Sequence, residues 1–198
     1  QESHCAEILK IASQHAGALL TPGGRMELHP TLRGCLRLAF KPPEDVLISI
    51  MIPFRDGLEL NKACVNSIRC LAGHVPYELI LIDNGSTHAS TLDWIEEQRA
   101  LPNVQVLHFP IPFNYSRLVN LARPHCRGSH LLLLNNDVEF AGPNVLARLL
   151  DPFAYSKTAA VGARLLYPDG SIQHQGVILT RGERGCVREP GKHIAEQS

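Results

Sequence analysis

The sequence has 198 residues, 44% hydrophobic and 19% charged, which fits one folded domain with a small addition. Lys and Arg residues number 19 and balance 19 Asp and Glu residues, so the charge gives no reason to expect a nucleic-acid partner. The six cysteines form no C-x-x-C pair, which argues against a structural zinc site and favours reduced thiols in a cytoplasmic protein.

Residues 1–45 are predicted to form an extension before the main domain. A helix is expected over 3–16, and this segment lacks the basic start and apolar centre of a signal peptide. A weak strand pair follows, and a linker ends at Pro42 and Pro43. No apolar run approaches the roughly 18 residues of a membrane span, so no transmembrane segment is predicted.

Residues 46–198 are predicted to form one α/β domain. The β-branched run 46–53 is typical of a strand covered on both faces. Residues 60–71 have the 3.6-residue period of a helix, and Gly73 is a stop signal. The alternation of strands and helices predicts a mostly parallel sheet with helices on both faces. The remaining expected elements are strand 77–83, helix 91–99, strand 104–109, helix 114–122, strand 130–134, helix 143–150 starting at Pro143, and a hairpin of 159–167 with 172–179.

Polar clusters follow three of the predicted strands. They are Arg55-Asp56, Asp83-Asn84 and Asn135-Asn136-Asp137. In parallel α/β sheets, ligands bind beyond the carboxyl ends of the strands. The clusters therefore predict one ligand site at that edge of the sheet.

The residues leave two interpretations of these clusters open. Asp83 can accept hydrogen bonds from a base or ribose, or it can stabilise the turn that follows it. The cluster 135–137 can be a polar loop, or it can bind a cation, because Mg²⁺ often takes only one or two carboxylates plus substrate phosphates. The four leucines of the preceding strand, expected to be buried, favour the ligand-binding interpretation.

Several common nucleotide and hydrolase motifs are absent. The first strand is followed by 53–57, "PFRDG", rather than G-x-G-x-x-G, which argues against a Rossmann dinucleotide site. The sequence also has no G-x-x-x-x-G-K-[ST] and no G-x-S-x-G, which argues against a P-loop NTPase and a hydrolase elbow.

Five segments within residues 46–180 resemble the inverting family-2 glycosyltransferases of the GT-A fold. They are most similar to the rhamnosyltransferase-like bacterial members that build polysaccharides. The segments are "ISIMIPFRDG", "YELILIDNGST", "PFNYSRLVNLA", "LLLLNNDVEF" and "GARLLYPDGSIQHQGVIL", in the family's order.

The resemblance implies transfer of a sugar, with inversion, from a UDP- or dTDP-linked donor to a saccharide or lipid-linked saccharide acceptor. It also implies a divalent metal, Mg²⁺ or Mn²⁺, and a role in cell-surface polysaccharide synthesis. A cytoplasmic location is expected, with peripheral membrane association as an open alternative.

The family's base-binding positions correspond here to three residues. Pro53 and Arg55 would lie against the base and ribose, with the Arg55 guanidinium stacked on the pyrimidine face. Asp83 would hydrogen-bond the base.

The family's diphosphate and metal positions correspond to the next set. Asn135 and Asp137 occupy the ends of its Asp-x-Asp motif: Asn135 would contact the ribose or a metal-bound water, and Asp137 would bind the metal. Asn136 between them would bind the nucleotide sugar. Asn114 and Arg117 would face the diphosphate, with helix capping and surface charge as the alternative.

Two departures from the family pattern bear on function. Asn135 replaces the first aspartate of the metal motif, and no segment matches the acidic catalytic base that the family carries beyond the final hairpin. Glu183, Glu189 and Glu196 lack its surroundings and are expected in a solvated tail. The sequence therefore resembles the donor-binding half of a transferase, truncated at the C-terminus, and predicts no catalytic residue.

The sequence leaves two functions other than glycosyl transfer open. A nucleotide-sugar-binding module, inactive by itself within a larger protein, is favoured by the missing base. A nucleotidyltransferase is disfavoured, because residues 53–60, "PFRDGLEL", lack the glycine-rich basic loop that such enzymes carry after the first strand.

Overall fold

The computed structural model describes residues 17–29 and 35–175. Its contacts divide the chain into two compact units: residues 41–148, and residues 1–40 together with 149–198. The helix predicted over 3–16 and the acidic residues of the predicted C-terminal tail lie outside the described residues. The predicted domain boundary at residue 45 stays a prediction.

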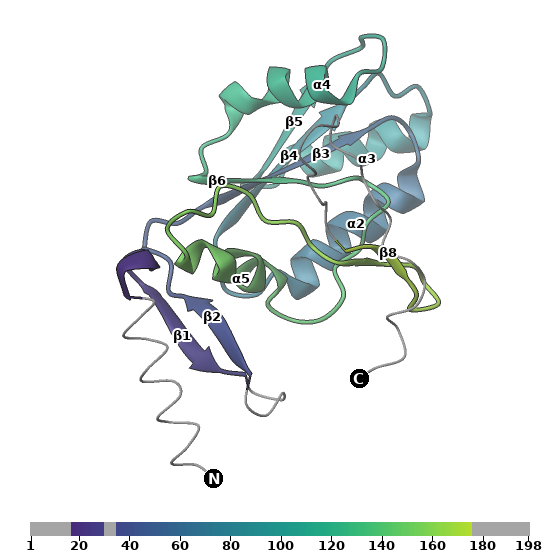
Figure 1. The fold of residues 1–198 in the computed structure, drawn as a ribbon. Coiled ribbons are helices and arrows are strands. Elements are labelled where there is room, and N and C mark those ends of the chain that lie inside the picture. The colour runs from purple at the N-terminus through teal and green to yellow at the C-terminus, as the bar shows by residue number, and fades with distance from the viewer. Residues whose placement is uncertain (1–16, 30–34, 176–198) are drawn as a thin grey trace, which may run out of the picture. The chain divides into compact units, whose positions relative to one another are not determined.

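A four-stranded parallel sheet forms the centre of residues 41–148 (Figure 1). Its strand order is β5-β4-β3-β6, and every neighbouring pair is parallel. The mostly parallel α/β sheet predicted from the sequence is therefore confirmed. The strands are β3 (Ile48–Phe54), β4 (Tyr77–Asp83), β5 (Val104–His108) and β6 (His130–Leu133).

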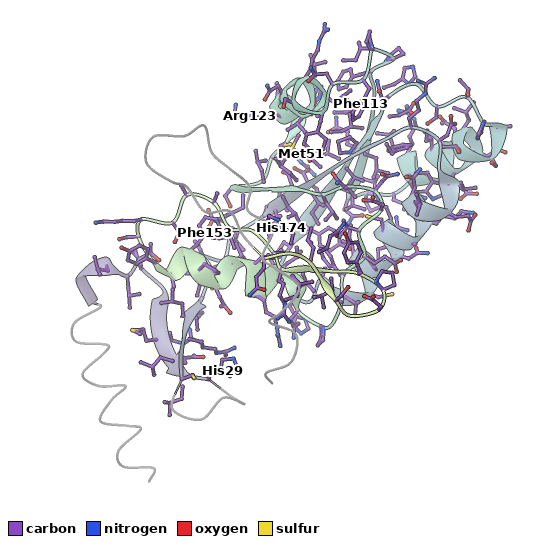
Figure 2. The ribbon with its side chains drawn as sticks, turned by 45° about the vertical axis from the view of Figure 1, so that its right-hand side comes forward. His29, Met51, Phe113, Arg123, Phe153 and His174 are labelled. Carbon is purple, nitrogen blue, oxygen red and sulfur yellow. The ribbon has the colours of Figure 1, made fainter. Side chains whose placement is uncertain are left out.

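Helices cover both faces of this sheet (Figure 1). Helix α4 (Tyr115–Ala122) lies on one side, and α2 (Leu58–Leu71) and α3 (Ala89–Arg99) lie on the other. Met51 lies beneath α4 (Figure 2) and packs in one buried cluster with Leu118 of that helix. Because side chains alternate along a strand, the equally buried Ile50 and Ile52 face the opposite side. The sheet is thus a two-sided core whose carboxyl edge stays open.

The edge strand β6 differs from its prediction. Its four-leucine run was expected to be buried, but the side chains of Leu131 and Leu133 are 45% and 50% exposed. Leu131 and Leu133 share one face of this strand because side chains alternate along it, and the described residues cover that face only partly. By contrast, every residue of the central strand β3 is buried, as predicted.

One helix begins later than the sequence predicted. Helix α5 (Val145–Leu150) starts two residues after Pro143. Asn144 between them has a φ of 58°, in the left-handed region, and this backbone conformation cannot continue into a right-handed helix.

The described residues also contain three short 3-10 helices: η1 (Gly17–Leu19), η2 (Arg123–His125) and η3 (Asp151–Ala154).

The other unit contains two antiparallel strand pairs. Strands β1 (Gly24–Leu28) and β2 (Leu36–Phe40) form the predicted pair, and the backbone N–H of Phe40 donates to Asp151 Oδ1 of η3 at 3.1 Å. Strands β7 (Leu165–Leu166) and β8 (Ile172–His174) form the predicted hairpin, shorter than the sequence suggested.

Candidate functional site

A pocket of about 320 Å³ opens beyond the carboxyl ends of β3 and β6. Five residues to which the sequence assigned an individual role line it, and so do five without such a role. The predicted ones are Pro53, Arg55, Asn135, Asn136 and Asp137. The others are Phe54, Asn84, Phe113, Tyr115 and Leu118.

The strand ends around the pocket are held together by backbone hydrogen bonds. Asn84 N donates to Phe54 O at 2.8 Å, which joins the ends of β4 and β3. Leu134 N donates to Met51 O at 3.0 Å, which ties the residue after β6 to the same central strand. The parallel register therefore brings the three predicted polar clusters to one edge.

Asp83 is placed differently from the other predicted residues. Its side chain is buried, and it does not line the pocket. Its Oδ1 accepts the backbone N–H of Ser86 at 2.8 Å, and its Oδ2 lies 2.6 Å from Nδ1 of the half-exposed His108. The first contact is the turn-stabilising role that the sequence left open. The predicted contact with a base stays a prediction.

Asn84 lines the pocket as a member of the predicted Asp83-Asn84 cluster, although the sequence assigned it no individual role. It is 5% exposed, and its Nδ2 donates to the carbonyl oxygens of Phe109 and Ile111, both at 2.8 Å. These bonds fix the loop after β5, which continues to the pocket residue Phe113. Its position directly after a strand was the signal that placed it in this cluster.

The start of α4 shows the helix cap that the sequence left open as an alternative. Asn114 is the N-cap of the helix and accepts the backbone N–H of Arg117 at 2.9 Å, and neither residue lines the pocket. Their neighbours Phe113 and Tyr115 do, and the Phe113 side chain is 75% exposed beside this helix (Figure 2). Burial raises the pKa of the Tyr115 phenol, which therefore stays neutral. The predicted diphosphate contacts of Asn114 and Arg117 stay predictions.

The cluster after β6 forms a turn with unequal side chains. Asn135 and Asp137 are exposed, whereas Asn136 is half-buried and its Nδ2 donates to Asn61 Oδ1 at 2.8 Å. Val138 N closes the turn on Asn135 O at 3.4 Å. The two exposed residues are thus the ones whose side chains remain available to a ligand.

The oxygen atoms of Asp137 and Asn135 are the candidate ligands for a divalent metal. No group of three or more His, Cys, Asp and Glu residues forms a metal cluster within residues 17–29 and 35–175. The Asp137 carboxylate lines the pocket and makes no hydrogen bond or ion pair with those residues. One free carboxylate with the nearby Asn135 amide fits Mg²⁺ or Mn²⁺ when phosphate oxygens and water complete the coordination shell.

A pocket that combines polar and apolar side chains at the carboxyl edge of a parallel sheet places the molecule among the α/β ligand-binding domains. Residues 49–192 match the sequence profile of glycosyl transferase family 2, and the chain belongs to this family. The family resemblance predicted from the sequence is confirmed, and the fold is of the GT-A type that it implied.

Two curated relatives align with about three quarters of the chain. The O-antigen biosynthesis protein RfbC of Myxococcus xanthus is 35% identical over 149 residues, which are 75% of this chain and 12% of that protein. An uncharacterized protein of Sinorhizobium fredii, y4gI, is 40% identical over 151 residues, 74% of this chain and 17% of that protein. The chain therefore spans less than a fifth of the length of either relative.

Two solved structures are also similar. The mannosyltransferase PcManGT of Pyrobaculum calidifontis, in complex with GDP-Man and Mn²⁺, has a TM-score of 0.49 at 17% identity, over 65% of this chain and 40% of its own. S. aureus TarS 1-349, in complex with UDP, has a TM-score of 0.43 at 20% identity, over 54% of this chain and 32% of its own.

Proposed function

We propose that this chain binds the donor of a glycosyl transfer, a UDP- or dTDP-linked sugar, in the pocket at the carboxyl ends of β3 and β6. The acceptor would be a saccharide or a lipid-linked saccharide, and the transfer would invert the anomeric carbon. The observation that carries the proposal is the convergence of Arg55, Asn84 and Asp137 on one pocket of a family-2 domain.

The base and ribose would lie on the β3 side of the pocket. The exposed Arg55 guanidinium makes no hydrogen bond or ion pair with the described part of the chain, so its face is available to stack on a pyrimidine. The exposed Phe113 ring supplies a second flat surface.

The diphosphate would lie on the β6 side. Asp137 and Asn135 would hold the divalent metal together with the phosphate oxygens. A bound metal would neutralise the charge that develops on the leaving diphosphate. Asp137 provides the fixed negative charge that makes metal binding favourable at this edge of the pocket.

Transfer also requires a carboxylate that takes the proton of the acceptor hydroxyl as it attacks. Asp137 is the one Asp or Glu that lines the pocket among the described residues, and it is assigned to the metal. This observation favours a second candidate function, a nucleotide-sugar-binding module that relies on another part of a larger protein for its base.

The biological role is proposed from the relatives. The similarity to an O-antigen biosynthesis protein supports a role in cell-surface polysaccharide synthesis. No helix within the described ranges is long and apolar enough to cross a bilayer. The cytoplasmic location and the peripheral membrane association stay predictions.

Calorimetric titration of the full chain with UDP and dTDP, with and without Mn²⁺, tests the donor site. We expect metal-dependent binding, and we expect Asp137→Ala to remove the metal dependence while leaving weak nucleotide binding. Asp169→Ala is the matched control, because this exposed carboxylate lies in the β7–β8 turn, in the other unit. Absence of binding by the folded wild-type chain would refute the proposal, and a turnover assay then separates a transferase from a module.

A further inference from the structure

Helix α2 carries polar groups on its buried side. Asn61, Cys64 and Ser67 follow one another at intervals of three residues, so they lie along one side of the helix. Asn61 is 2% exposed and Cys64 is fully buried. A buried amide on a helix needs hydrogen-bond partners, so its partners reveal what this face is for.

All three side chains bind the segment that follows β6. Asn61 Oδ1 accepts Nδ2 of Asn136 at 2.8 Å, and Cys64 Sγ donates to the backbone oxygen of Asn135 at 3.7 Å. Ser67 Oγ accepts the backbone N–H of Phe140 at 3.0 Å. The segment 135–140 is therefore attached to α2 at its start and at its end.

All three side chains of the turn line the pocket, and the attachment decides which of them remain without a hydrogen bond to the described residues. Asn136 is directed to the helix by Asn61, while its neighbours Asn135 and Asp137 remain exposed at the pocket. A rotation of the turn that offered Asn136 to a ligand would leave the buried Asn61 amide without this partner. The buried contact therefore fixes one orientation of the turn.

Asn61 also joins the two sides of the pocket. Its Nδ2 donates to the backbone oxygen of Asp56 at 2.8 Å, in the loop that carries Arg55. The Asp56 carboxylate in turn accepts the backbone N–H groups of Thr87 and His88, both at 2.9 Å. One buried amide thus connects the loops after β3 and β6, and through Asp56 the loop after β4.

We propose that Asn61 and Ser67 are positioning residues, which hold the turn after β6 so that Asp137 and Asn135 present their oxygens to the metal and diphosphate. They touch neither ligand and act through Asn136 and the backbone of Phe140. The role of the turn in metal binding rests on the proposed function, whereas its attachment to α2 does not.

The first test measures backbone hydrogen exchange in a peptide covering residues 134–141 of the nucleotide-free chain. We expect Asn61→Ala and Ser67→Ala to speed exchange there about tenfold, because each removes a bond that holds the segment closed. Gln98→Ala is the matched control: this buried amide lies on α3, accepts from Arg69 at 2.7 Å, and does not line the pocket. Exchange in β4 monitors global stability, and an unchanged rate over 134–141 in both folded variants would overturn the proposal.

The second test measures the ratio of the UDP dissociation constants without and with Mn²⁺. We expect Asn61→Ala to reduce this ratio about tenfold, a typical effect of removing a group that orients metal ligands, and Gln98→Ala to keep it. Asn136→Ala should have the same effect, and the double variant should add little, because both residues form one contact. Retention of the wild-type ratio in Asn61→Ala would overturn the proposal. Should the wild-type chain bind UDP without metal dependence, the proposed metal site at Asp137 fails, and the exchange experiment decides the attachment of the turn by itself.

Discussion

Asp83 offers the sharpest test of how the site is built. In the structure its carboxylate is bound by the protein, through Ser86 N and His108, and does not line the pocket. We therefore expect substitutions of Asp83 to act on stability first and on nucleotide binding only through the turn that it holds. Direct contact with the base would produce the opposite order of effects.

The size of the stability effect follows from the two contacts. Asp83→Ala leaves the buried Ser86 N–H without its acceptor, which costs about 1–3 kcal/mol. The contact with His108 adds about 1 kcal/mol at most, because that side chain is 51% exposed and solvent screens it. We expect the free energy of unfolding to fall by about 1–4 kcal/mol. Asp83→Asn keeps an oxygen for Ser86 and should cost about 1 kcal/mol.

Urea unfolding and UDP calorimetry on the same samples measure the two effects. For Asp83→Asn we expect the UDP dissociation constant to change less than about threefold. Thr91→Ala is the control, because its buried hydroxyl lies on α3 and has no hydrogen-bond partner within the described residues. A variant Asp83→Asn that unfolds like the wild type but binds UDP more than about tenfold more weakly would refute this reasoning and restore the base contact.

Three further predictions concern other parts of the same unit. Burial raises the pKa of the Glu78 carboxyl, but hydrogen bonds from Ser49 and Arg127 together outweigh it and lower that pKa below 4.5. The ionised Glu78 carboxylate therefore stabilises the fold above pH 4.5, and this contribution is lost as the pH falls through the folded-state pKa. The midpoint of urea unfolding, measured as a function of pH, should show this loss in the wild type and a smaller loss in Glu78→Gln. Burial raises the pKa of the Cys64 thiol to about 12, so this thiol should not react with an alkylating reagent at neutral pH, whereas the exposed Cys70 should. Mass spectrometry of the alkylated protein measures both. Equal labelling of the two cysteines would contradict the burial of Cys64. Gly128→Ala should destabilise the fold strongly, because the new Cβ would lie 2.6 Å from Leu47 O and Ser49 N. In Gly142→Ala the new Cβ meets no atom within 4 Å, and the only cost is the positive φ of that residue. The thermal unfolding midpoints of the two variants test this difference.

The sequence predicts the sheet because its signals are local. The apolar run of β3 and the period of α2 each determine an element, and parallel strand order then brings Arg55 and Asp137 to one edge. The burial of β6 was not predictable in this way, because the exposure of Leu131 depends on what lies beside the sheet and not on the strand's own residues.

The site residues were predictable by position but not by orientation. Sequence position places Asp83 and Asn84 together at the end of β4, yet only Asn84 lines the pocket. Consecutive residues at a strand end point in different directions, and hydrogen bonds to distant loops decide which side chain faces the ligand. The partner of Asn136 is Asn61, 75 residues away, and no pattern in the sequence marks that pair.

Hydrogen-bond partners therefore separate two kinds of polar residue at this edge of the sheet. Asp56, Asp83 and Asn136 are held by other parts of the protein, and each of them fixes a loop. Arg55 and Asp137 are exposed, line the pocket and make no hydrogen bond or ion pair with the described residues, so their charges are free for a ligand. A guanidinium on one side of a pocket and a carboxylate on the other match a ligand with a flat base at one end and a metal-bound diphosphate at the other. The residues held by the protein keep those two charges in place, because a ligand that spans both is bound tightly only when the distance between them is fixed before it arrives.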